Sequence, residues 1–413
     1  MKGKVVKHDG GGLQRRHLLF GGAAAGLGAV AAIGLQVVNG AEKAPVQPAA
    51  DVQHGSAKVP FYGARQAGIG TAPQAHGAFV ALELHPETTR ERVRSLLKLL
   101  SDDAARLTQG KAALADTEAE LAVHPARLTV TFGFGPRLLQ SVAPQQAPGW
   151  LKPLPDFSID QLVPEFSGGD LLLQICSDDP VTVAHAKRML LKDSRSFAAV
   201  KWVQSGFRRA HGTEASGTTM RNLFGQVDGT SNAVPGGEPY EKVVWGDGRI
   251  PSWTENGTSL VIRRIRMDLD TWDELDRSGR EESVGRKLGN GAPLTGVQEH
   301  DEPDFKALNP HGFPVIADFS HMRRSRPDDE TQRIFRRAYN YDGAPSAGSV
   351  SESGLIFACY QADVDKQFVP IQQRLDELDL LNTWTTPIGS AVFAIPPGCQ
   401  PGGFIGDGLF TGS

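Results

Sequence analysis

A short apolar run followed by an amphipathic helical pattern occurs four times in this chain. The runs cover residues 77–84, 170–180, 259–269 and 354–363, each with an acidic residue or a proline near its exit. After the first run, Val93, Leu96, Leu97 and Leu100 have the i, i+3, i+4, i+7 spacing of one buried helix face. Two such units per half, with further strand candidates such as residues 127–135 between them, predict an α+β fold. We expect two ferredoxin-like domains, the second repeating the first.

The length of the chain suits two domains, and one long loop divides it. With 413 residues, 40% of them hydrophobic and 22% charged, the chain can form two ordinary cores. Residues 215–240 are rich in glycine and show no periodicity, and loops of this length inside compact proteins are often functional. We therefore expect an N-terminal domain over residues 56–220 and a C-terminal domain over residues 221–413.

The first fifty residues have a different composition. After Arg15 and Arg16 no charged residue occurs until Glu42, and alanine and glycine dominate the run between them. This pattern predicts a twin-arginine signal peptide and linker over residues 1–50. An uncleaved membrane anchor is the alternative, because about twenty such residues can span a bilayer. The twin-arginine machinery exports folded proteins, often with a cofactor already inserted, so we expect a periplasmic or extracellular protein.

Replacing both arginines by lysine tests the twin-arginine assignment. The double variant Arg15→Lys, Arg16→Lys keeps the charge but removes the arginine pair, so we expect its precursor to accumulate in the cytoplasm. Cell fractionation and immunoblotting of the variant beside the wild type measure this. Export of the variant at the wild-type level would contradict the assignment.

Charge and cysteine content exclude several classes of protein. The net charge of −4, without a basic and aromatic-rich tract, gives no support for nucleic-acid binding. The three cysteines Cys176, Cys359 and Cys399 include no C-x-x-C pair, which excludes a disulfide framework and a thiolate metal cluster. No histidine pair has the spacing of a helical zinc site, and no G-x-S-x-G stretch of a serine hydrolase occurs.

One carboxylate in the long loop has two interpretations. The stretch GQVDGTSN places Asp228 among glycines and small polar residues. An aspartate in such a loop commonly caps a turn by accepting a backbone N–H. The alternative is a carboxylate that is held in place to accept and return a proton.

His321 follows a strand-like run and lies in a basic cluster. The stretches FSHMRRSRP and RIFRRAYNYDG contain Arg323, Arg324, Arg326, Arg333, Arg336 and Arg337. One interpretation is a solvated surface histidine. The other is a haem site, since a haem needs an imidazole ligand, cations for its propionates and an apolar wall. His311, in NPHGFP, is the weaker candidate ligand.

Together these segments resemble the dye-decolorising peroxidase family. GQVDGT is similar to the G-x-x-D-G motif of that family, FSHMRRSRP to its proximal-histidine segment and IFRRAYNYDG to its distal-arginine segment. The resemblance covers almost the whole chain after residue 60 and is strongest to the exported deferrochelatase/peroxidase subfamily. It implies two ferredoxin-like domains with one haem b per chain in the C-terminal domain. The implied reaction is reduction of hydrogen peroxide coupled to oxidation of dyes, phenols or other small reductants.

The resemblance also implies a role for each motif residue. His321 is the expected iron ligand, Asp228 the distal acid–base residue and Arg336 the distal arginine. The other expected haem contacts are Gly229, Thr230 and Ser231 along the haem face and Arg326 near a propionate. This chain departs from many relatives in having Arg326-Pro327-Asp328 instead of Asn-Pro-Arg, and in a shorter spacing from His321 to Arg336. Arg333 and Arg337 are therefore alternatives that could share the role of Arg336.

An aspartate suits proton transfer to and from peroxide in mild acid. Aspartate has a reference pKa of about 3.9 and histidine one of about 6.5, so aspartate remains a base where histidine is already charged. A neighbouring arginine would keep the carboxylate ionised and stabilise charge on the leaving oxygen. We therefore expect activity to be highest in mild acid.

Other functions fit the same residues or the same fold. A deferrochelatase, which releases iron from haem and leaves the porphyrin intact, would use the same site and would have iron-uptake proteins as partners. A non-catalytic binding module would need no haem. The sequence leaves the physiological reductant and a homodimer open. Core packing is the favoured interpretation, over radical transfer, for the aromatic residues near the motifs, Tyr339, Tyr341, Tyr360 and Trp384.

Overall fold

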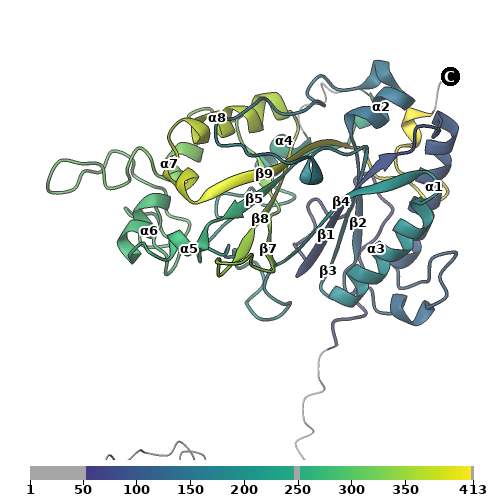
Figure 1. Ribbon diagram of the computed structural model, residues 1–413, viewed down its shortest axis with the longest axis horizontal. Coiled ribbons are helices and arrows are strands. Elements are labelled where there is room, and N and C mark those ends of the chain that lie inside the picture. The colour runs from purple at the N-terminus through teal and green to yellow at the C-terminus, as the bar shows by residue number, and fades with distance from the viewer. Residues whose placement is uncertain (1–52, 246–251, 411–413) are drawn as a thin grey trace, which may run out of the picture. The chain divides into compact units, whose positions relative to one another are not determined.

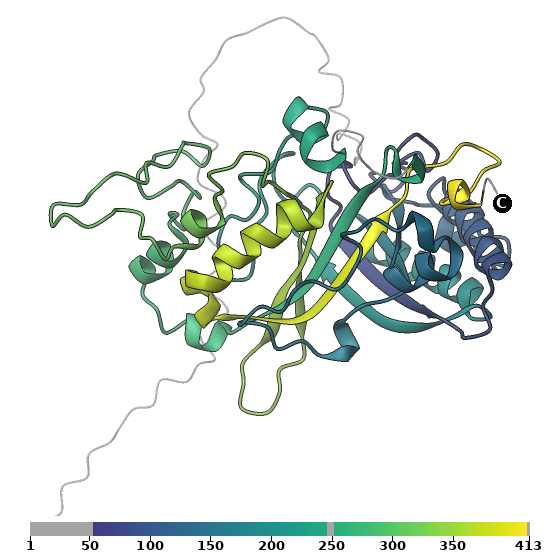
Figure 2. The same cartoon turned by 90° about the horizontal axis from the view of Figure 1, so that it is seen from above.

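The computed structural model describes residues 53–245 and 252–410 and is shown in Figures 1 and 2. The predicted signal peptide lies outside the described residues. The strands are β1 (His76–Leu84), β2 (Thr129–Phe134), β3 (Leu171–Ser177), β4 (Ala198–Phe207), β5 (Thr258–Met267), β6 (Phe335–Arg336), β7 (Tyr339–Gly343), β8 (Glu352–Gln361) and β9 (Thr385–Ile395). The helices are α1 (Arg90–Leu107), α2 (Pro136–Val142), α3 (Pro180–Ser194), α4 (Glu238–Trp245), α5 (Leu269–Trp272), α6 (Arg277–Val284), α7 (His321–Ser325) and α8 (Val369–Leu378).

The four predicted strand–helix units are present as β1–α1, β3–α3, β5–α5 and β8–α8. Side chains cap the helices of the first two units. Thr89 accepts a hydrogen bond from a backbone N–H of α1, and Asp179 accepts two from backbone N–H groups of α3. A wider π-helical turn, formed by residues Val364–Phe368, precedes the helix after β8. Pro370 follows in the first turn of α8, where no backbone N–H is needed.

The strands of both halves form one antiparallel sheet. Its order is β5-β9-β2-β3-β1-β4-β7-β8-β6, and an additional β5–β8 pairing closes the sheet into a barrel-like ring. The N-terminal strands have the order β2-β3-β1-β4 and the C-terminal strands the order β7-β8-β5-β9. If the two-residue strand β6 is left out, the strands of each half lie in the order second, third, first, fourth, counted along the chain. Single residue pairs join the halves, Phe134 with Ala394 and Phe207 with Asn340.

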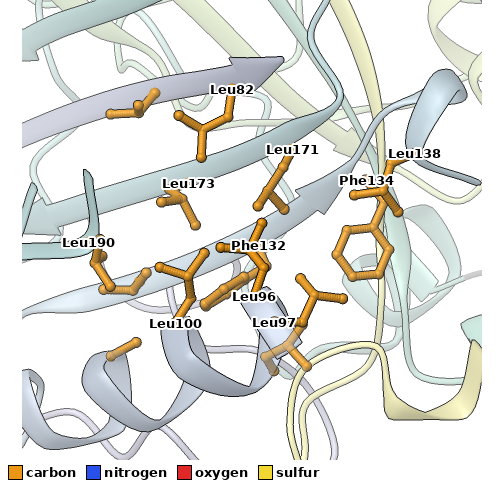
Figure 3. Packing of buried hydrophobic residues seen from close by; sticks show 14 of the residues in the cluster. Leu82, Leu96, Leu97, Leu100, Phe132, Phe134, Leu138, Leu171, Leu173 and Leu190 are labelled. Carbon is orange, nitrogen blue, oxygen red and sulfur yellow. The ribbon is translucent and has the colours of Figure 1, made fainter. Parts of the chain in front are cut away.

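The helices of the N-terminal half cover one face of its strands. Leu96, Leu97 and Leu100 of α1 face Phe132 of β2 and Leu173 of β3, and all five side chains are fully buried (Figure 3). Replacing a buried leucine of this kind by alanine costs about 2–5 kcal/mol. The spacing that predicted this helix therefore marks the face that stabilises the N-terminal half.

Two carboxyl groups meet between α1 and α3 in this half. Asp103 is fully buried, and its Oδ1 accepts a hydrogen bond from Leu114 N at 2.7 Å. The Oδ2 atoms of Asp103 and Asp193 are both buried, and no N–H group of the described residues donates to either of them. Burial, a hydrogen bond with Asp103 and repulsion by its charge raise the pKa of Asp193 to about 7. A proton shared between the two carboxyl groups would explain this raised pKa.

Because of this pair, we expect the free energy of unfolding to fall as the pH rises. The folded-state pKa of Asp193 lies above its unfolded value. Its contribution to the free energy of unfolding is therefore complete below about pH 4 and is lost as the pH rises through about 7. We expect Asp193→Asn to remove most of this loss, about 1–3 kcal/mol after allowance for partial exposure. Thermal unfolding of wild type and variant between pH 4 and 8 measures it, with the exposed neighbour Asp102→Asn as control. Parallel pH profiles for wild type and Asp193→Asn would refute the shared proton.

No helix in the described part of the chain is long and apolar enough to span a bilayer.

Candidate active site

Asp228 lies in the long loop after β4, and its carboxylate pairs with Arg336. Asp228 Oδ1 accepts a hydrogen bond from Arg336 Nη1 at 2.7 Å, and Oδ2 lies 3.4 Å from Asn222 Nδ2. The side chains of Asp228 and Arg336 are 12% and 26% exposed, so solvent screens their attraction less than that of a surface pair. Among the described residues no backbone N–H donates to the Asp228 carboxylate. The carboxylate therefore does not cap its turn.

Hydrogen bonds within the loop shape the chain around Asp228. Asn222 N donates to Gln226 O, and Gln226 N donates in return to Asn222 Oδ1. Gly229 follows with a φ of +131°, which residues with a side chain rarely adopt. The motif glycine therefore turns the backbone immediately after the carboxylate.

Asn232 fixes the backbone of Arg336 from the same loop. Its Nδ2 donates to Arg336 O at 2.7 Å, and its Oδ1 accepts from Arg336 N at 2.9 Å. The next residue, Arg337, is fully buried and donates to Thr71 O and Gln74 Oε1. Side chains of consecutive residues in extended chain point to opposite faces. Arg337 is therefore placed away from Asp228 and lines neither this site's cavity nor the one next to it, which gives no support to the prediction that it could share the role of Arg336.

His321 is the first residue of α7, and a carboxylate orients its ring. Its Nδ1 donates to Asp379 Oδ2 at 2.6 Å, and Leu381 N donates to Asp379 Oδ1 at 3.1 Å. Burial alone would lower the pKa of His321, but the charge and hydrogen bond of Asp379 outweigh it and raise the pKa. Nε2 makes no hydrogen bond with any described residue. The imidazole is thus held by one nitrogen and leaves the other for a ligand.

Asp228, Arg336 and His321 all line one cavity of about 270 Å³, named here the first cavity. Alternate residues of two paired strands form one wall: Arg263, Ile265 and Met267 on β5, Leu355 and Phe357 on β8. The helices α7 and α8 form another wall with Met322, Ile371 and Leu375. The first cavity therefore combines apolar walls with a histidine, a carboxylate–guanidinium pair and further arginines, which include Arg263 and Arg286.

The other predicted site residues have different positions. Gly229, Thr230, Ser231, Arg326 and Arg333 line the first cavity. Thr230 Oγ1 donates to Glu299 Oε1 at 2.9 Å, while Arg326 pairs with Glu302 at 2.6 Å and Arg333 with Glu330 at 2.7 Å. The weaker candidate His311 is exposed in a loop and lines neither this cavity nor the one described below.

A segment of the N-terminal half completes the first cavity. Ile159, in the long connection between β2 and β3, is one of the lining residues. Asp376 of α8 accepts hydrogen bonds from Ser158 N at 3.0 Å and Ile159 N at 3.1 Å. Asp160 pairs with the buried Arg263 of β5. Residues 157–163 thus contribute both an apolar contact and a counter-charge to a site whose other walls come from the C-terminal half.

A second cavity, of about 1170 Å³, reaches the same carboxylate from the loop side. The residues shared with the first cavity are Asn222, Asp228, Gly229, Thr230, Asn232 and Arg336. Its remaining walls come from residues 70–75, 207–212, 214–221 and 233–235 and from side chains that include Arg127 and Asp178. Asp228 and Arg336 therefore stand between two cavities.

The sequence analysis missed the residues that hold these groups in place, namely Asn222, Asn232, Glu299 and Asp379. Asn222 and Asn232 flank the aspartate motif closely enough to have been suspected. Asp379 is separated from His321 by 58 residues, and its only signal in the sequence was an acidic residue at the end of a helical pattern.

Comparisons with known proteins agree over most of the chain. Residues 66–208 match the family model described as Dyp-type peroxidase, N-terminal, and residues 219–400 match the one described as Dyp-type peroxidase, C-terminal. The chain is 35% identical to the dye-decolorizing peroxidase of Thermobifida fusca over 363 residues, with 84% of each chain covered. It is also 35% identical to the deferrochelatase of Escherichia coli K12 over 364 residues, 83% of this chain and 85% of the relative. The crystal structure of a DyP-type peroxidase from Cellulomonas bogoriensis is similar with a TM-score of 0.84 and 51% identity, covering 87% of this chain and 100% of that one.

Proposed function

This chain belongs to the Dyp-type peroxidase family, and from that premise we propose that Asp228, Arg336 and His321 form its peroxide-reducing centre. Membership makes the protein a haem-dependent peroxidase, an oxidoreductase. The observation that carries the residue assignment is the first cavity, where a histidine oriented by a carboxylate shares one apolar space with an aspartate–arginine pair.

The residues of the first cavity fit a haem. His321 would bind the iron through Nε2, because Nδ1 is committed to Asp379. Ile265, Leu355 and Ile371 offer the apolar contacts that a porphyrin needs. Arg326 and Arg333 lie at the same cavity as candidate partners for propionates, although each is engaged by a glutamate in the structure described here. The bound haem supplies an iron at which peroxide is reduced and from which oxidising equivalents pass to the donor.

Asp228 is the group that moves the proton in this proposal. Asp228 lines both cavities. Its carboxylate accepts the proton of one peroxide oxygen and returns it to the other, so that water leaves. The hydrogen bond from Asn222 and the pair with Arg336 hold both carboxylate oxygens in position. The proton can then pass between peroxide and Asp228 without a rearrangement of the Asp228 side chain.

Arg336 has two tasks in the same step. Its Nη1 orients the Asp228 carboxylate through a charge-assisted hydrogen bond. Its guanidinium also stabilises negative charge that develops on the departing oxygen. Asn232 supports both tasks, because its two hydrogen bonds fix the Arg336 backbone.

The finer architecture belongs to the same proposal. The equal strand order of the two halves supports a duplicated ferredoxin-like fold, and most lining residues of the first cavity come from elements after residue 221, which supports a haem in the C-terminal domain. The segment 157–163 adds one contact from the N-terminal half. Twin-arginine export, hydrogen peroxide and a small reductant as substrates, and a homodimer remain proposals that rest on the sequence.

Release of iron from haem is the second candidate function. It is favoured by the 35% identity to the deferrochelatase of Escherichia coli K12, which equals the identity to the dye-decolorizing peroxidase of Thermobifida fusca. Both activities would use the same cavity, with iron-uptake proteins as partners in the second case.

One set of measurements tests these functions. The protein is expressed with a haem precursor, and its absorption spectrum is expected to show one histidine-ligated ferric haem per chain. It is then incubated with peroxide and an anthraquinone dye, and separately with excess haem under reducing conditions. Dye oxidation supports the peroxidase, and accumulation of iron-free protoporphyrin supports the deferrochelatase. A protein that binds no haem would refute both.

A further inference from the structure

Residues 219–230, named here the Asp228 loop, fold back on themselves as two limbs. Arg221 of one limb and Val227 of the other form an isolated antiparallel pair, and Asp228 N donates to Met220 O at 2.8 Å. Beyond that hydrogen bond, no further backbone hydrogen bond between the limbs occurs among the described residues. The backbone pairing of the loop therefore ends at Asp228 itself.

Glu299, from a later part of the chain, joins the two limbs where the backbone pairing ends. Its Oε1 accepts a hydrogen bond from Thr219 Oγ1 at 2.6 Å and another from Thr230 Oγ1 at 2.9 Å. Thr219 directly precedes Met220 in one limb, and Thr230 lies two residues after Asp228 in the other. Hydrogen bonds to a carboxylate are stronger than those between neutral groups. One carboxylate oxygen therefore closes the open end of the Asp228 loop.

The backbone around Glu299 is itself fixed. Asp301 Oδ2 accepts hydrogen bonds from Val297 N at 2.7 Å and from Gln298 N at 2.9 Å. Arg286 Nη1 donates to the backbone oxygen of Glu299 at 3.0 Å, and Arg286 is a buried residue that also lines the first cavity. The carboxylate of Glu299 therefore contacts the Asp228 loop from a turn that is held in place by its own hydrogen bonds.

We propose that Glu299 is a positioning residue, which clamps the Asp228 loop so that the Asp228 carboxylate stays in place for proton transfer. This inference rests on the proposed role of Asp228 and extends it to a residue that lines neither cavity. Without the clamp, the limb after Asp228 would be free to rotate at Gly229, where the φ of +131° suits a residue without a side chain. A displacement of about 1 Å at a reacting group can lower a rate by about 100-fold. Two hydrogen bonds that do not touch the Asp228 carboxylate can therefore control the rate at which it moves a proton.

Three single variants separate the clamp from the charge of Glu299. Glu299→Ala removes the oxygen that both threonines contact, Glu299→Gln keeps an amide oxygen without the charge, and Thr219→Val removes one of the two hydrogen bonds. For each haem-loaded protein, the rate of the Soret absorbance change caused by hydrogen peroxide is measured. We expect this rate to fall by about 10–100-fold in Glu299→Ala and by about 3–10-fold in Thr219→Val, and to stay within about threefold of wild type in Glu299→Gln. Equal losses in Glu299→Ala and Glu299→Gln would overturn the proposal, since the charge and not the clamp would then be responsible.

A double variant tests whether Glu299 acts through Asp228. In Asp228→Asn the group that moves the proton is absent, so adding Glu299→Ala is expected to slow the reaction by no more than about threefold further. A loss of equal size with and without Asp228 would overturn the proposal, because Glu299 would then act by another route. A wild-type rate in Asp228→Asn alone would instead overturn the proposed function, and this inference with it.

Hydrogen exchange gives a readout that does not depend on catalysis. Backbone amides of residues 219–230 in the haem-loaded proteins are followed by mass spectrometry. We expect them to exchange several-fold faster in Glu299→Ala and Thr219→Val and at the wild-type rate in Glu299→Gln. Thr219→Ser, which keeps the hydroxyl group, should restore both the exchange and the reaction rate. Wild-type exchange in folded Glu299→Ala and Thr219→Val proteins would overturn the proposal.

Glu282→Ala is the matched control. Glu282 is an exposed residue of α6 that accepts a hydrogen bond from Ser278 Oγ at 3.0 Å and lines neither cavity. Its loss should leave the peroxide reaction and the exchange of residues 219–230 at their wild-type values. Haem content and thermal midpoint are measured for every variant. If Glu299→Ala does not fold or bind haem, the comparison of Thr219→Val with Thr219→Ser decides.

Discussion

Asp228→Asn is expected to slow the reaction of the haem-loaded protein with hydrogen peroxide by about 10²–10⁴, the usual contribution of general acid–base catalysis. An asparagine keeps the size and a hydrogen-bonding oxygen toward Arg336 but cannot take up the proton. Stopped-flow measurement of the Soret absorbance change gives the rate directly. Since Asp228 is not expected to bind iron, the variant should keep its full haem content.

Arg336→Leu belongs to the same test because the two residues act on the same proton. Loss of its electrostatic contribution is expected to cost about 10²–10³ in rate. The double variant should be less affected than the product of the single effects, since Arg336 acts partly through Asp228. The wild-type rate should be highest in mild acid, without an inflection near the histidine pKa of about 6.5. If Asp228→Asn reacts within a few-fold of wild type, another group or solvent moves the proton.

His321→Ala is expected to lose most of its haem. Under the proposed assignment the iron would lose its protein ligand, and no other described histidine lines the first cavity. The haem content of the purified variant, measured as pyridine haemochrome per chain, should fall several-fold and the Soret band of the ligated haem should disappear. Asp379→Asn leaves the imidazole but weakens its orientation, and should lower haem affinity by about 10–100-fold.

A matched control accompanies this prediction. His311→Ala removes an exposed histidine that lines neither cavity, and it should retain full haem content and the wild-type spectrum. Thermal unfolding of the haem-free proteins shows whether His321→Ala still folds. Full haem occupancy with an unaltered spectrum in a folded His321→Ala protein would show that another residue binds the iron.

Short motifs in the sequence were sufficient to select side chains that lie together in the structure. Asp228, Arg336 and His321 were selected from local stretches, and the structure brings all three to one cavity. The apolar spacing of Val93, Leu96, Leu97 and Leu100 likewise predicted a helix face that is fully buried. The four aromatic residues interpreted as core packing, Tyr339, Tyr341, Tyr360 and Trp384, are all buried. In these cases the signal lies within a few positions of the chain.

The residues that the sequence could not predict act through long-range contacts. Asp379 reaches His321 only after α8 has packed against α7, and no spacing in the chain encodes that meeting. The position of Arg337 depends on the direction of one extended segment, which places it toward Thr71 and Gln74 of the N-terminal half. A pair of consecutive arginines carries no sign of which one faces the cavity. Such choices are fixed by tertiary packing alone.

The contact of residues 157–163 with the first cavity has a consequence for the order of assembly. The C-terminal half cannot finish the pocket by itself, since Ile159 would be missing from its wall and the charge of buried Arg263 would lack Asp160. An unpaired buried guanidinium is strongly unfavourable. Separately produced halves would therefore bind the cofactor poorly. During synthesis the β2–β3 connection is made first, and the pocket can form only after α8 with Asp376 has been translated, about two hundred residues later.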